Sequence, residues 1–306
     1  MLIISQVKKV IPPDMAILKK LQLALEMIKF EHTVFALPFA LLSTVLAAGG
    51  WPEAEKLFWV LIAMVGARSA AMAFNRIADW RIDAANPRTR KRALPAGHLG
   101  LRFAIGFTLV SSFFFVAAAY ALNPLCFRLS FPLLAILFAY SYTKRLTTYS
   151  HLVLGFCLGL APLGAWIAIR GDIRLTPVLL CLIVLLWTAG FDIIYSCQDV
   201  DFDRHSGLFS IPKRFGIRSA LRISSGCHAV MLLLLVLLLY LEQLGWMSYT
   251  GAGLVASLIG YEHSLVRPED LSKVNQAFFT VNGYVSILLL VTVGLDRLLH
   301  QAGFRI

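Results

Sequence analysis

The chain has 306 residues, of which 58% are hydrophobic and only 15% are charged. About a quarter of the residues in an ordinary soluble domain are charged, so this composition excludes a typical water-soluble protein. The net charge of +11 does not indicate nucleic-acid binding in so apolar a chain, because loop cations of membrane proteins face anionic headgroups and set topology.

Nine apolar stretches follow one another along the chain, each close to the length of about 20 residues that a membrane-spanning helix needs. They predict an all-α, polytopic membrane protein that forms a single domain over residues 1–306. The five cysteines show no CxxC spacing, so neither a zinc site nor a disulfide framework is predicted. The predicted spans are 30–48, 58–78, 101–122, 125–143, 151–170, 177–196, 220–241, 245–261 and 278–299.

The loops alternate in their content of basic residues. Most of the 28 Lys and Arg residues fall in the N-terminal arm and in loops near 79–100, 144–150, 197–219 and 262–277. Because basic loops stay on the cytoplasmic side of a membrane, this asymmetry places the N-terminus in the cytoplasm and the C-terminus outside. The predicted location is therefore the cytoplasmic (inner) membrane.

The second span ends in a polar pattern, Asn75-x-x-x-Asp79-x-x-x-Asp83. Residues four apart share one face of a helix, so these side chains would form a single stripe. Two carboxylates and an amide suit Mg²⁺ that is shared with a diphosphate, although a solvated helix end is the plainer alternative. Arg68 lies seven residues before Asn75, and a cation inside a span normally faces a pocket or a buried partner.

The loop after this motif contains four cations in five residues. Arg88 and Arg92 would lie beside the metal–diphosphate site, where a guanidinium group binds phosphate oxygens with two parallel hydrogen bonds. A purely topological role for these positive charges is the alternative.

The loop after the fourth span carries Tyr140, Lys144 and Arg145. Tyr140 and Lys144 are four residues apart, so a phenol and an ammonium group on one face could hold a leaving phosphate. An interfacial aromatic residue beside a positive-inside pair is an equally good interpretation of the same residues.

The acidic pattern returns at the end of the sixth span as Tyr195-x-x-x-Asp199-x-x-x-Asp203. Both aspartates lie 120 residues after their counterparts, Asp79 and Asp83. A matched polar feature at the same end of two spans suggests duplicated halves, about 30–143 and 151–261, with the ninth span outside them. Two facing stripes could hold one diphosphate through two or three metal ions.

Three more polar residues surround the second motif. Asp192 lies seven residues before Asp199, deeper in the span, and an intramembrane carboxylate is a functional candidate by default. Asp201 would point away from the stripe. Lys213 follows a proline and precedes a glycine, as the cations after the first motif do.

Taken together, these motifs resemble the UbiA superfamily of intramembrane aromatic prenyltransferases over nearly the whole chain. The resemblance implies a nine-helix fold, a central cavity open to lipid and a cytoplasmic cap of loops. It implies Mg²⁺ ions that join the four motif aspartates to a polyprenyl diphosphate, with Asn75 beside them and with Tyr140 and Lys144 assisting diphosphate departure. The matching stretches are Asn75–Asp83 with R-x-L-P-A-G after it, Tyr140–Arg145 and Asp192–Asp203.

Within the superfamily the pattern is most similar to the 4-hydroxybenzoate polyprenyltransferase branch, which implies that Arg145 and Asp192 contact the aromatic acceptor. The implied role is in ubiquinone biosynthesis, with a dihydroxynaphthoate acceptor of menaquinone biosynthesis as the alternative. The chain lacks the Met-containing loop of haem farnesyltransferases, and it has Asn75-Arg76 where several branches have Asn-Asp.

Two other classes fit parts of the sequence. A secondary transporter would also have many spans, a repeat and intramembrane charges, but its site is usually near the bilayer midplane, whereas these acids gather at one surface. A lipid-phosphate hydrolase would release free prenol instead of a prenylated ring. The implied partners of the enzyme are a polyprenyl diphosphate, an aromatic acid and membrane lipid, without nucleic acid.

Overall fold

The computed structural model describes residues 22–29 and 33–302. The basic N-terminal arm and the start of the first predicted span lie outside the described residues. Within these residues all regular secondary structure is helical. One isolated bridge joins Arg267 and Asp270, and no strand occurs there. The predicted all-α class is confirmed.

Nine helices of 16 residues or more occur in the described part of the chain, and each coincides with a predicted span to within a few residues. They are α2 (Thr33–Ala48), α3 (Ala54–Ala78), α5 (Leu101–Leu122), α6 (Pro124–Tyr140), α7 (Ser150–Arg170), α8 (Leu175–Ser196), α11 (Ile217–Leu241), α12 (Trp246–Ser264) and α13 (Asn282–Gln301).

Six stretches of the described chain are long and apolar enough to cross a membrane, so this is an integral membrane protein. They contain α3, α5, α7, α8, α11 and α13. Phe35–Ala48 and Pro124–Tyr140 are shorter apolar helices, and α12 carries Glu262 and His263 near its end. The predicted number of nine spans is therefore not confirmed.

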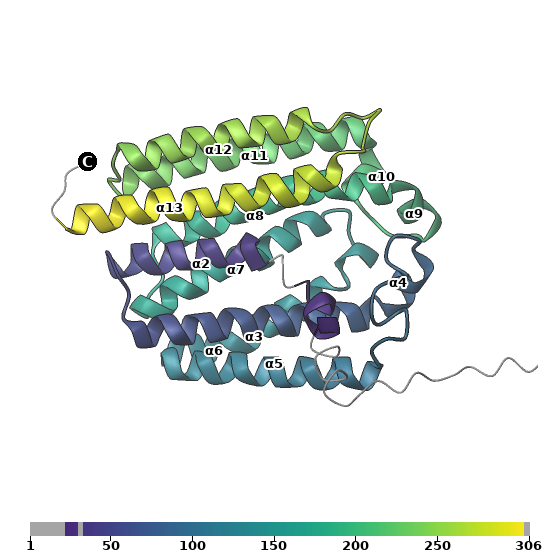
Figure 1. The fold of residues 1–306 in the computed structure, drawn as a ribbon, viewed down its shortest axis with the longest axis horizontal. Helices are drawn as coiled ribbons and strands as arrows, with labels where there is room; N and C mark the ends of the chain where they lie inside the picture. Colours follow the sequence, from purple (N-terminus) through teal and green to yellow (C-terminus); the bar gives the residue numbers. More distant parts are fainter. Residues whose placement is uncertain (1–21, 30–32, 303–306) are drawn as a thin grey trace, which may run out of the picture.

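The long helices run side by side in one bundle (Figure 1). Helices α3, α5 and α6 form one side, α11, α12 and α13 form the other, and α2, α7 and α8 lie between them. The largest buried cluster joins α2 to α8, where Phe35 and Phe39 pack against Trp187 and Phe191. Edge-to-face and tilted ring contacts of this kind stabilise a core beyond the area they bury.

Helices α7 and α8 approach each other closely because glycines line the contact. A Cβ atom on Gly155 would lie 2.2 Å from the carbonyl oxygen of Leu185, and one on Gly159 would lie 2.5 Å from that of Cys181. Two glycines four residues apart allow helix backbones to touch, as in other membrane helix pairs.

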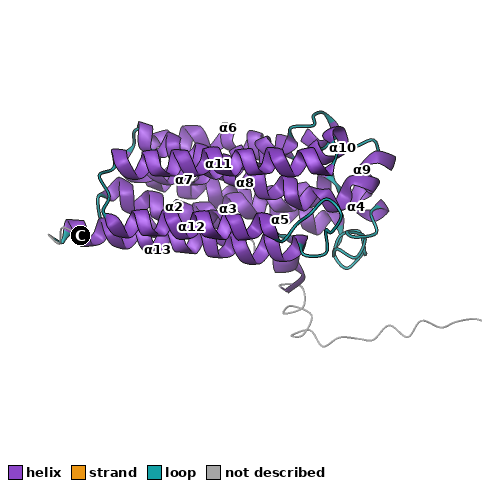
Figure 2. Cartoon of the chain, turned by 90° about the horizontal axis from the view of Figure 1, so that it is seen from above, coloured by secondary structure: helices purple, strands orange, loops and turns teal. Residues whose placement is uncertain are grey.

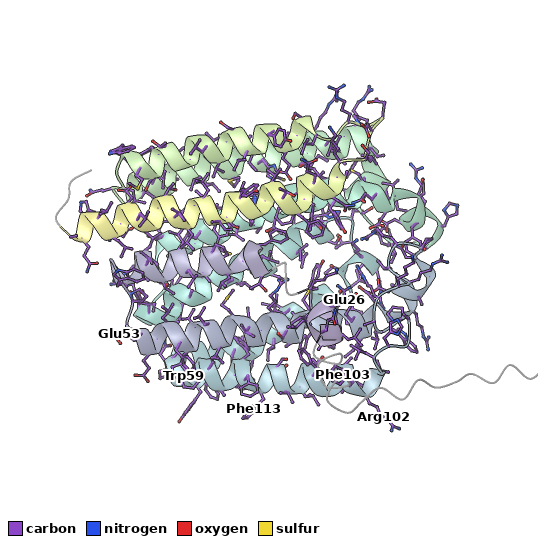
Figure 3. All side chains as sticks on the ribbon, viewed as in Figure 1. Glu26, Glu53, Trp59, Arg102, Phe103 and Phe113 are labelled. Carbon is purple, nitrogen blue, oxygen red and sulfur yellow. The ribbon has the colours of Figure 1, made fainter. Side chains whose placement is uncertain are left out.

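Large apolar side chains cover the outside of the bundle. Phe103 and Phe113 project from α5 along one edge (Figure 3), and Phe113 is 68% exposed. Exposed aromatic residues on a long apolar helix are stable against lipid tails, because there the hydrophobic effect does not oppose their exposure.

The short helices gather at one end of the bundle, opposite the end of α13 (Figures 1 and 2). They are α4 (Trp80–Ala85), α9 (Val200–His205) and α10 (Ile211–Phe215). Helices α4 and α9 contain the second aspartate of each acidic motif, so the fold brings both motifs to the same end. Whether the chain consists of duplicated halves stays a prediction.

Candidate active site

Both acidic motifs break their helix at the first aspartate. Asp79 (φ −95°, ψ 5°) joins α3 to α4, and Asp199 (φ −101°, ψ 4°) ends the 3₁₀ turn η3 (Cys197–Asp199) and precedes α9. The continuous stripe expected from four-residue spacing is therefore interrupted, because both aspartates adopt backbone angles near the bridge region. Asp83 and Asp203 each occupy the fourth position of a six-residue helix, so the two motifs share one local form.

Asp79 is held by an amide and a guanidinium group. Its Oδ2 accepts from Asn75 Nδ2 at 3.0 Å, and its Oδ1 accepts from Arg145 Nη2 at 2.9 Å. Burial raises the pKa of Asp79, and the nearby charge of Asp83 raises it further, while the hydrogen bond from Arg145 lowers it. Arg145, expected at an acceptor carboxylate, thus contacts an acidic motif in this structure.

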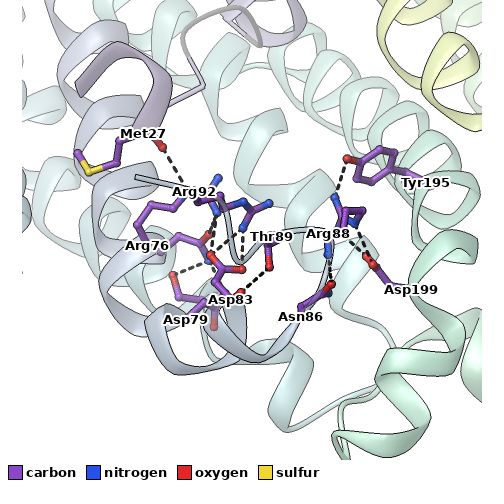
Figure 4. A network of polar contacts seen from close by, with 12 residues as sticks. Met27, Arg76, Asp79, Asp83, Asn86, Arg88, Thr89, Arg92, Tyr195 and Asp199 are labelled. Carbon is purple, nitrogen blue, oxygen red and sulfur yellow. Dashed lines mark hydrogen bonds and ion pairs between the residues drawn. The ribbon is translucent and has the colours of Figure 1, made fainter. Parts of the chain in front are cut away.

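Asp83 is buried and lies between two arginines (Figure 4). Arg92 Nη1 donates to both carboxylate oxygens, at 2.7 and 2.8 Å, and Arg76 Nη1 lies 3.6 Å from Oδ2. The Nε of Arg76 donates to the carbonyl oxygen of Met27, which links this corner to the segment before α2. The sequence predicted that Arg92 lies at the site, but it did not predict a role there for Arg76.

Asp199 receives a two-point contact from the loop that follows the first motif. Arg88 Nε lies 2.9 Å from Oδ1 and Arg88 Nη2 lies 2.6 Å from Oδ2, while Arg88 Nη1 donates to the hydroxyl of Tyr195 at 2.9 Å (Figure 4). The Oδ1 atom of Asn86 accepts from the backbone N–H of Arg88 and fixes the turn. This side chain therefore joins the loop after the first motif to the second motif.

The Tyr140–Lys144 segment lies between the motifs. The charge of Lys144 is close enough to act on Asp79, Asp192 and Asp203, which come from α3, α8 and α9. Tyr140, at the end of α6, interacts electrostatically with Asp79 and Asp192. Lys144 is therefore near carboxylates of both motifs, and Tyr140 is near Asp79 of the first motif and near Asp192.

Asp192 and Asp203 are joined by residues that sequence reasoning missed. His151 Nε2 accepts from the backbone N–H of Ile211 at 3.4 Å, so its Nδ1 carries the proton that Asp192 Oδ2 accepts at 2.7 Å. One residue earlier, Ser210 Oγ donates to Asp203 Oδ2 at 2.8 Å. A serine before Ile-Pro is an N-cap signal that would have found Ser210, whereas a lone histidine at the start of a span has no such signal.

Two predicted residues donate to backbone carbonyl groups. Arg68 Nη2 donates to the carbonyl oxygen of Lys29 at 3.1 Å, which places it against the segment before α2. Lys213 Nζ donates to the carbonyl oxygen of Leu208 at 2.6 Å and lies 5.4 Å from the ring centre of Phe209. The first contact joins α3 to the segment before α2, and the second joins α10 to the loop that precedes it.

A cavity of about 460 Å³ lies beside the first motif. Ile77, Trp80 and Arg145 line it from one side, and Ser206 and Leu208 line it from the loop between α9 and α10. Residues of both motif segments therefore line one open hollow, which includes the chain neighbours of Asp79, Ala78 and Trp80, but not Asp79 itself.

The donor set fits a divalent cation that is shared with a diphosphate. Among the described residues, no three His, Cys, Asp or Glu side chains gather closely enough to hold a metal ion by themselves. The aspartates instead come in two pairs, and Mg²⁺ is usually held by one or two carboxylates together with substrate phosphates. The cations that surround the pairs suit the phosphate oxygens of such a ligand.

The family model of the UbiA prenyltransferase family matches residues 36–284. The chain belongs to the UbiA prenyltransferase family. The 4-hydroxybenzoate octaprenyltransferase of Vibrio parahaemolyticus is 33% identical over 250 residues, which cover 81% of this chain and 86% of that protein.

Solved structures of UbiA homologues have the same fold. The apo structure of a UbiA homologue from Aeropyrum pernix K1 is 36% identical, has a TM-score of 0.80, and the match covers 87% of this chain and 98% of that one. A UbiA homologue from Archaeoglobus fulgidus, bound to DMAPP and Mg²⁺, is 18% identical with a TM-score of 0.69, and covers 90% of this chain and 98% of its own. The predicted resemblance to UbiA prenyltransferases is confirmed.

Proposed function

We propose that this UbiA family member transfers a polyprenyl group from a polyprenyl diphosphate to 4-hydroxybenzoate. The observation that carries the proposal is the contact of Arg88 with Asp199 and Tyr195, because Arg88 lies in the loop directly after the first acidic motif and so brings that loop to the second motif, 120 residues further along the chain. The name of the Vibrio relative supports the acceptor, and membership of a prenyltransferase family favours an enzyme over a transporter.

The diphosphate end of the site is assigned to the two motifs. Asp79, Asp83, Asp199 and Asp203 would hold Mg²⁺, which neutralises the leaving diphosphate when it is bound. In this structure three of these aspartates pair with arginines, which also bind phosphate oxygens well. When the diphosphate binds, Arg88, Arg92 and Arg145 would release the carboxylate and donate to a phosphate, because a planar guanidinium group suits both. Asn75 keeps Asp79 in place through this exchange.

The chemistry needs stabilisation of the leaving group and protection from water. The C–O bond of the allylic diphosphate breaks and both electrons leave with the diphosphate. The ring carbon next to the phenol carbon then forms the new C–C bond with the allylic carbon, and its proton passes to the departed diphosphate, which restores the aromatic ring. Lys144 and Tyr140 would bind the departing oxygens, because Lys144 is within electrostatic reach of carboxylates from both motifs. The buried apolar cluster that packs against Tyr195 would keep water from the allylic cation.

The acceptor end is assigned to the base of the same site. Asp192, whose Oδ2 is fixed by His151, would direct its second oxygen to the phenol hydroxyl. Arg145 would bind the benzoate carboxylate as well as Asp79, since a guanidinium group has donors for two partners. Tyr195 supports Arg88, Lys213 closes the cap, and Arg68 holds the segment before α2.

The basic loops support an orientation with the N-terminus and both motifs on the cytoplasmic side of the inner membrane. In this orientation water-soluble 4-hydroxybenzoate enters from the cytoplasm, while the isoprenoid tail stays among lipid tails.

The test is a product assay with purified protein in nanodiscs. Mg²⁺, geranyl diphosphate and 4-hydroxybenzoate should yield a prenylated hydroxybenzoate by mass spectrometry, and Asp79→Ala or Asp199→Ala should reduce its rate at least a thousandfold. Asp201→Asn is the matched control, because Asp201 lies in the second motif but its side chain is exposed and pairs with Arg204, at 3.6 Å. It should keep the wild-type rate.

Two outcomes would overturn the proposal. Normal turnover by either alanine variant would remove the role of the motifs, and free prenol as the sole product would indicate a hydrolase. A dihydroxynaphthoate offered in parallel separates the two quinone pathways, because the preferred acceptor has the higher kcat/KM.

A further inference from the structure

A wide turn interrupts the last helix next to the site. Residues Gln276–Val281 form a π-helical turn (η4) directly before α13. Single π turns are rare and concentrate at functional sites, because the wider spacing loses regular hydrogen bonds and persists only where other groups hold it. The turn lies against α8, which carries Tyr195 one residue before its end and is followed by η3 with Asp199.

A buried asparagine holds this turn. Asn282 is completely buried, and its Nδ2 lies 3.1 Å from the carbonyl oxygen of Ala277 and 3.3 Å from that of Phe278. The same Nδ2 donates to Oε1 of Glu262, on α12, at 2.9 Å. Asn282 therefore bonds the turn from inside and is itself fixed by a second helix.

Glu262 is also completely buried, and Asn282 is the partner of its Oε1. Its other oxygen, Oε2, lies 4.0 Å from His228 Nδ1, which is too long for a hydrogen bond. Burial of a carboxyl group with so few donors is costly. The prenyltransfer chemistry proposed above does not use this group, so its cost requires another explanation.

Phe278 carries the effect of this turn to the site. Its ring packs on the ring of Tyr195 with centroids 4.1 Å apart, and it also contacts Phe35 and Phe191. Arg88 is over the Tyr195 ring, 5.2 Å from the centroid, and donates to its hydroxyl. A shift of Phe278 would therefore move the phenol that holds the guanidinium group.

We propose that Glu262 and Asn282 are positioning residues: together they hold the π turn so that Phe278 fixes Tyr195, and through it Arg88, for binding of the prenyl diphosphate. The inference rests on the proposed function. The contact of Arg88 with Tyr195 does not use Asp199, so it keeps the guanidinium group in the site when Asp199 binds another partner.

The test compares Glu262→Leu with Glu262→Gln. Leucine removes the acceptor for Asn282, whereas glutamine keeps an oxygen at the same place. In nanodiscs, Glu262→Leu should raise the KM for geranyl diphosphate about tenfold and leave the KM for 4-hydroxybenzoate within twofold. It should also weaken binding of geranyl S-thiolodiphosphate, measured by its protection against thermal unfolding, while Glu262→Gln should restore both values.

Two further variants guard against a simple folding defect. Phe278→Leu leaves the Glu262–Asn282 pair intact but removes the ring on Tyr195, so it should reproduce the KM increase. Ser257→Ala, at an exposed position of α12, should behave as wild type. In a Tyr195→Ala background Glu262→Leu should add less than twofold, because both changes act through the same ring.

The outcomes separate the two proposals. An active wild type whose Glu262→Leu and Phe278→Leu variants keep the wild-type KM and analogue binding would overturn the positioning role alone. Equal increases of both KM values, or additive effects in the Tyr195→Ala background, would also overturn it. A wild type that neither binds the analogue nor transfers a prenyl group would overturn the proposed function and this inference with it.

Discussion

Substitution of Gly155 by alanine tests how closely α7 and α8 must approach. The added Cβ would lie 2.2 Å from the carbonyl oxygen of Leu185, whereas ordinary contact begins at 3.4 Å. The helices must therefore separate locally by about 1.2 Å, because the obstacle is backbone and cannot rotate away. Gly155 is one turn from His151 on the same face of α7.

The magnitude follows from this displacement. Overpacking of a tight contact costs about 1–3 kcal/mol, and separated side chains also lose part of their dispersion energy, so we expect about 2–3 kcal/mol of destabilisation. The same movement would stretch the His151–Asp192 hydrogen bond from 2.7 Å to about 3.9 Å, beyond hydrogen-bonding range. We therefore expect the KM for 4-hydroxybenzoate to rise about tenfold.

The free energy of unfolding would be measured in mixed micelles by titration with a denaturing detergent, and KM by the product assay. Gly164→Ala is the matched control on the same helix, because no atom lies within 4 Å of its added Cβ. That variant should be neutral or up to about 1 kcal/mol more stable, since alanine favours a helix over glycine. Equal stability of the two alanine variants, or an unchanged acceptor KM in Gly155→Ala, would refute the reasoning.

Two further changes test the polar cap. Arg88→Lys keeps the charge but loses the two-point contact with Asp199, so the KM for geranyl diphosphate should rise about tenfold with little change for the acceptor, and equal KM values would contradict it. Ser210→Ala removes both the N-cap of α10 and a donor to Asp203, so it should cost about 1 kcal/mol of unfolding free energy and raise the Mg²⁺ concentration for half-maximal rate, whereas Ser257→Ala should change neither.

The helices were predictable because their signal is local. Each apolar stretch has the length and composition of a helix in lipid, so the bounds of α5, 101–122, follow from its sequence alone. The number of spans was harder, because α6 contains Arg128 and Pro132, and α12 has a polar end. Length and hydropathy describe a helix by itself and do not show whether its neighbours shield its polar residues.

The candidate site residues were predicted from spacing, but their partners were not. The 120-residue spacing of the two motifs predicted that Asp79 and Asp199 belong to one site. That Arg145 contacts Asp79, or that His151 meets Asp192, depends on how α3, η2 (Thr143–Arg145), α7 and α8 pack, which no short pattern encodes. The π turn is a further case, because its sequence lacks proline and glycine, and the buried Asn282 that bonds its carbonyl groups follows it in the chain.

The central place of α8 has a consequence for the order in which the chain enters the bilayer. Two-thirds of its spanning stretch is enclosed by protein, compared with 28% for α3 and α5. The side-chain partners of the acids at its end, Arg88 for Asp199 and His151 for Asp192, are synthesised before it, whereas α11, which packs against it, is synthesised later. A nascent chain that stops after α9 therefore already contains both hydrogen-bonding partners, while the face of α8 that α11 covers in the complete protein is still open to lipid.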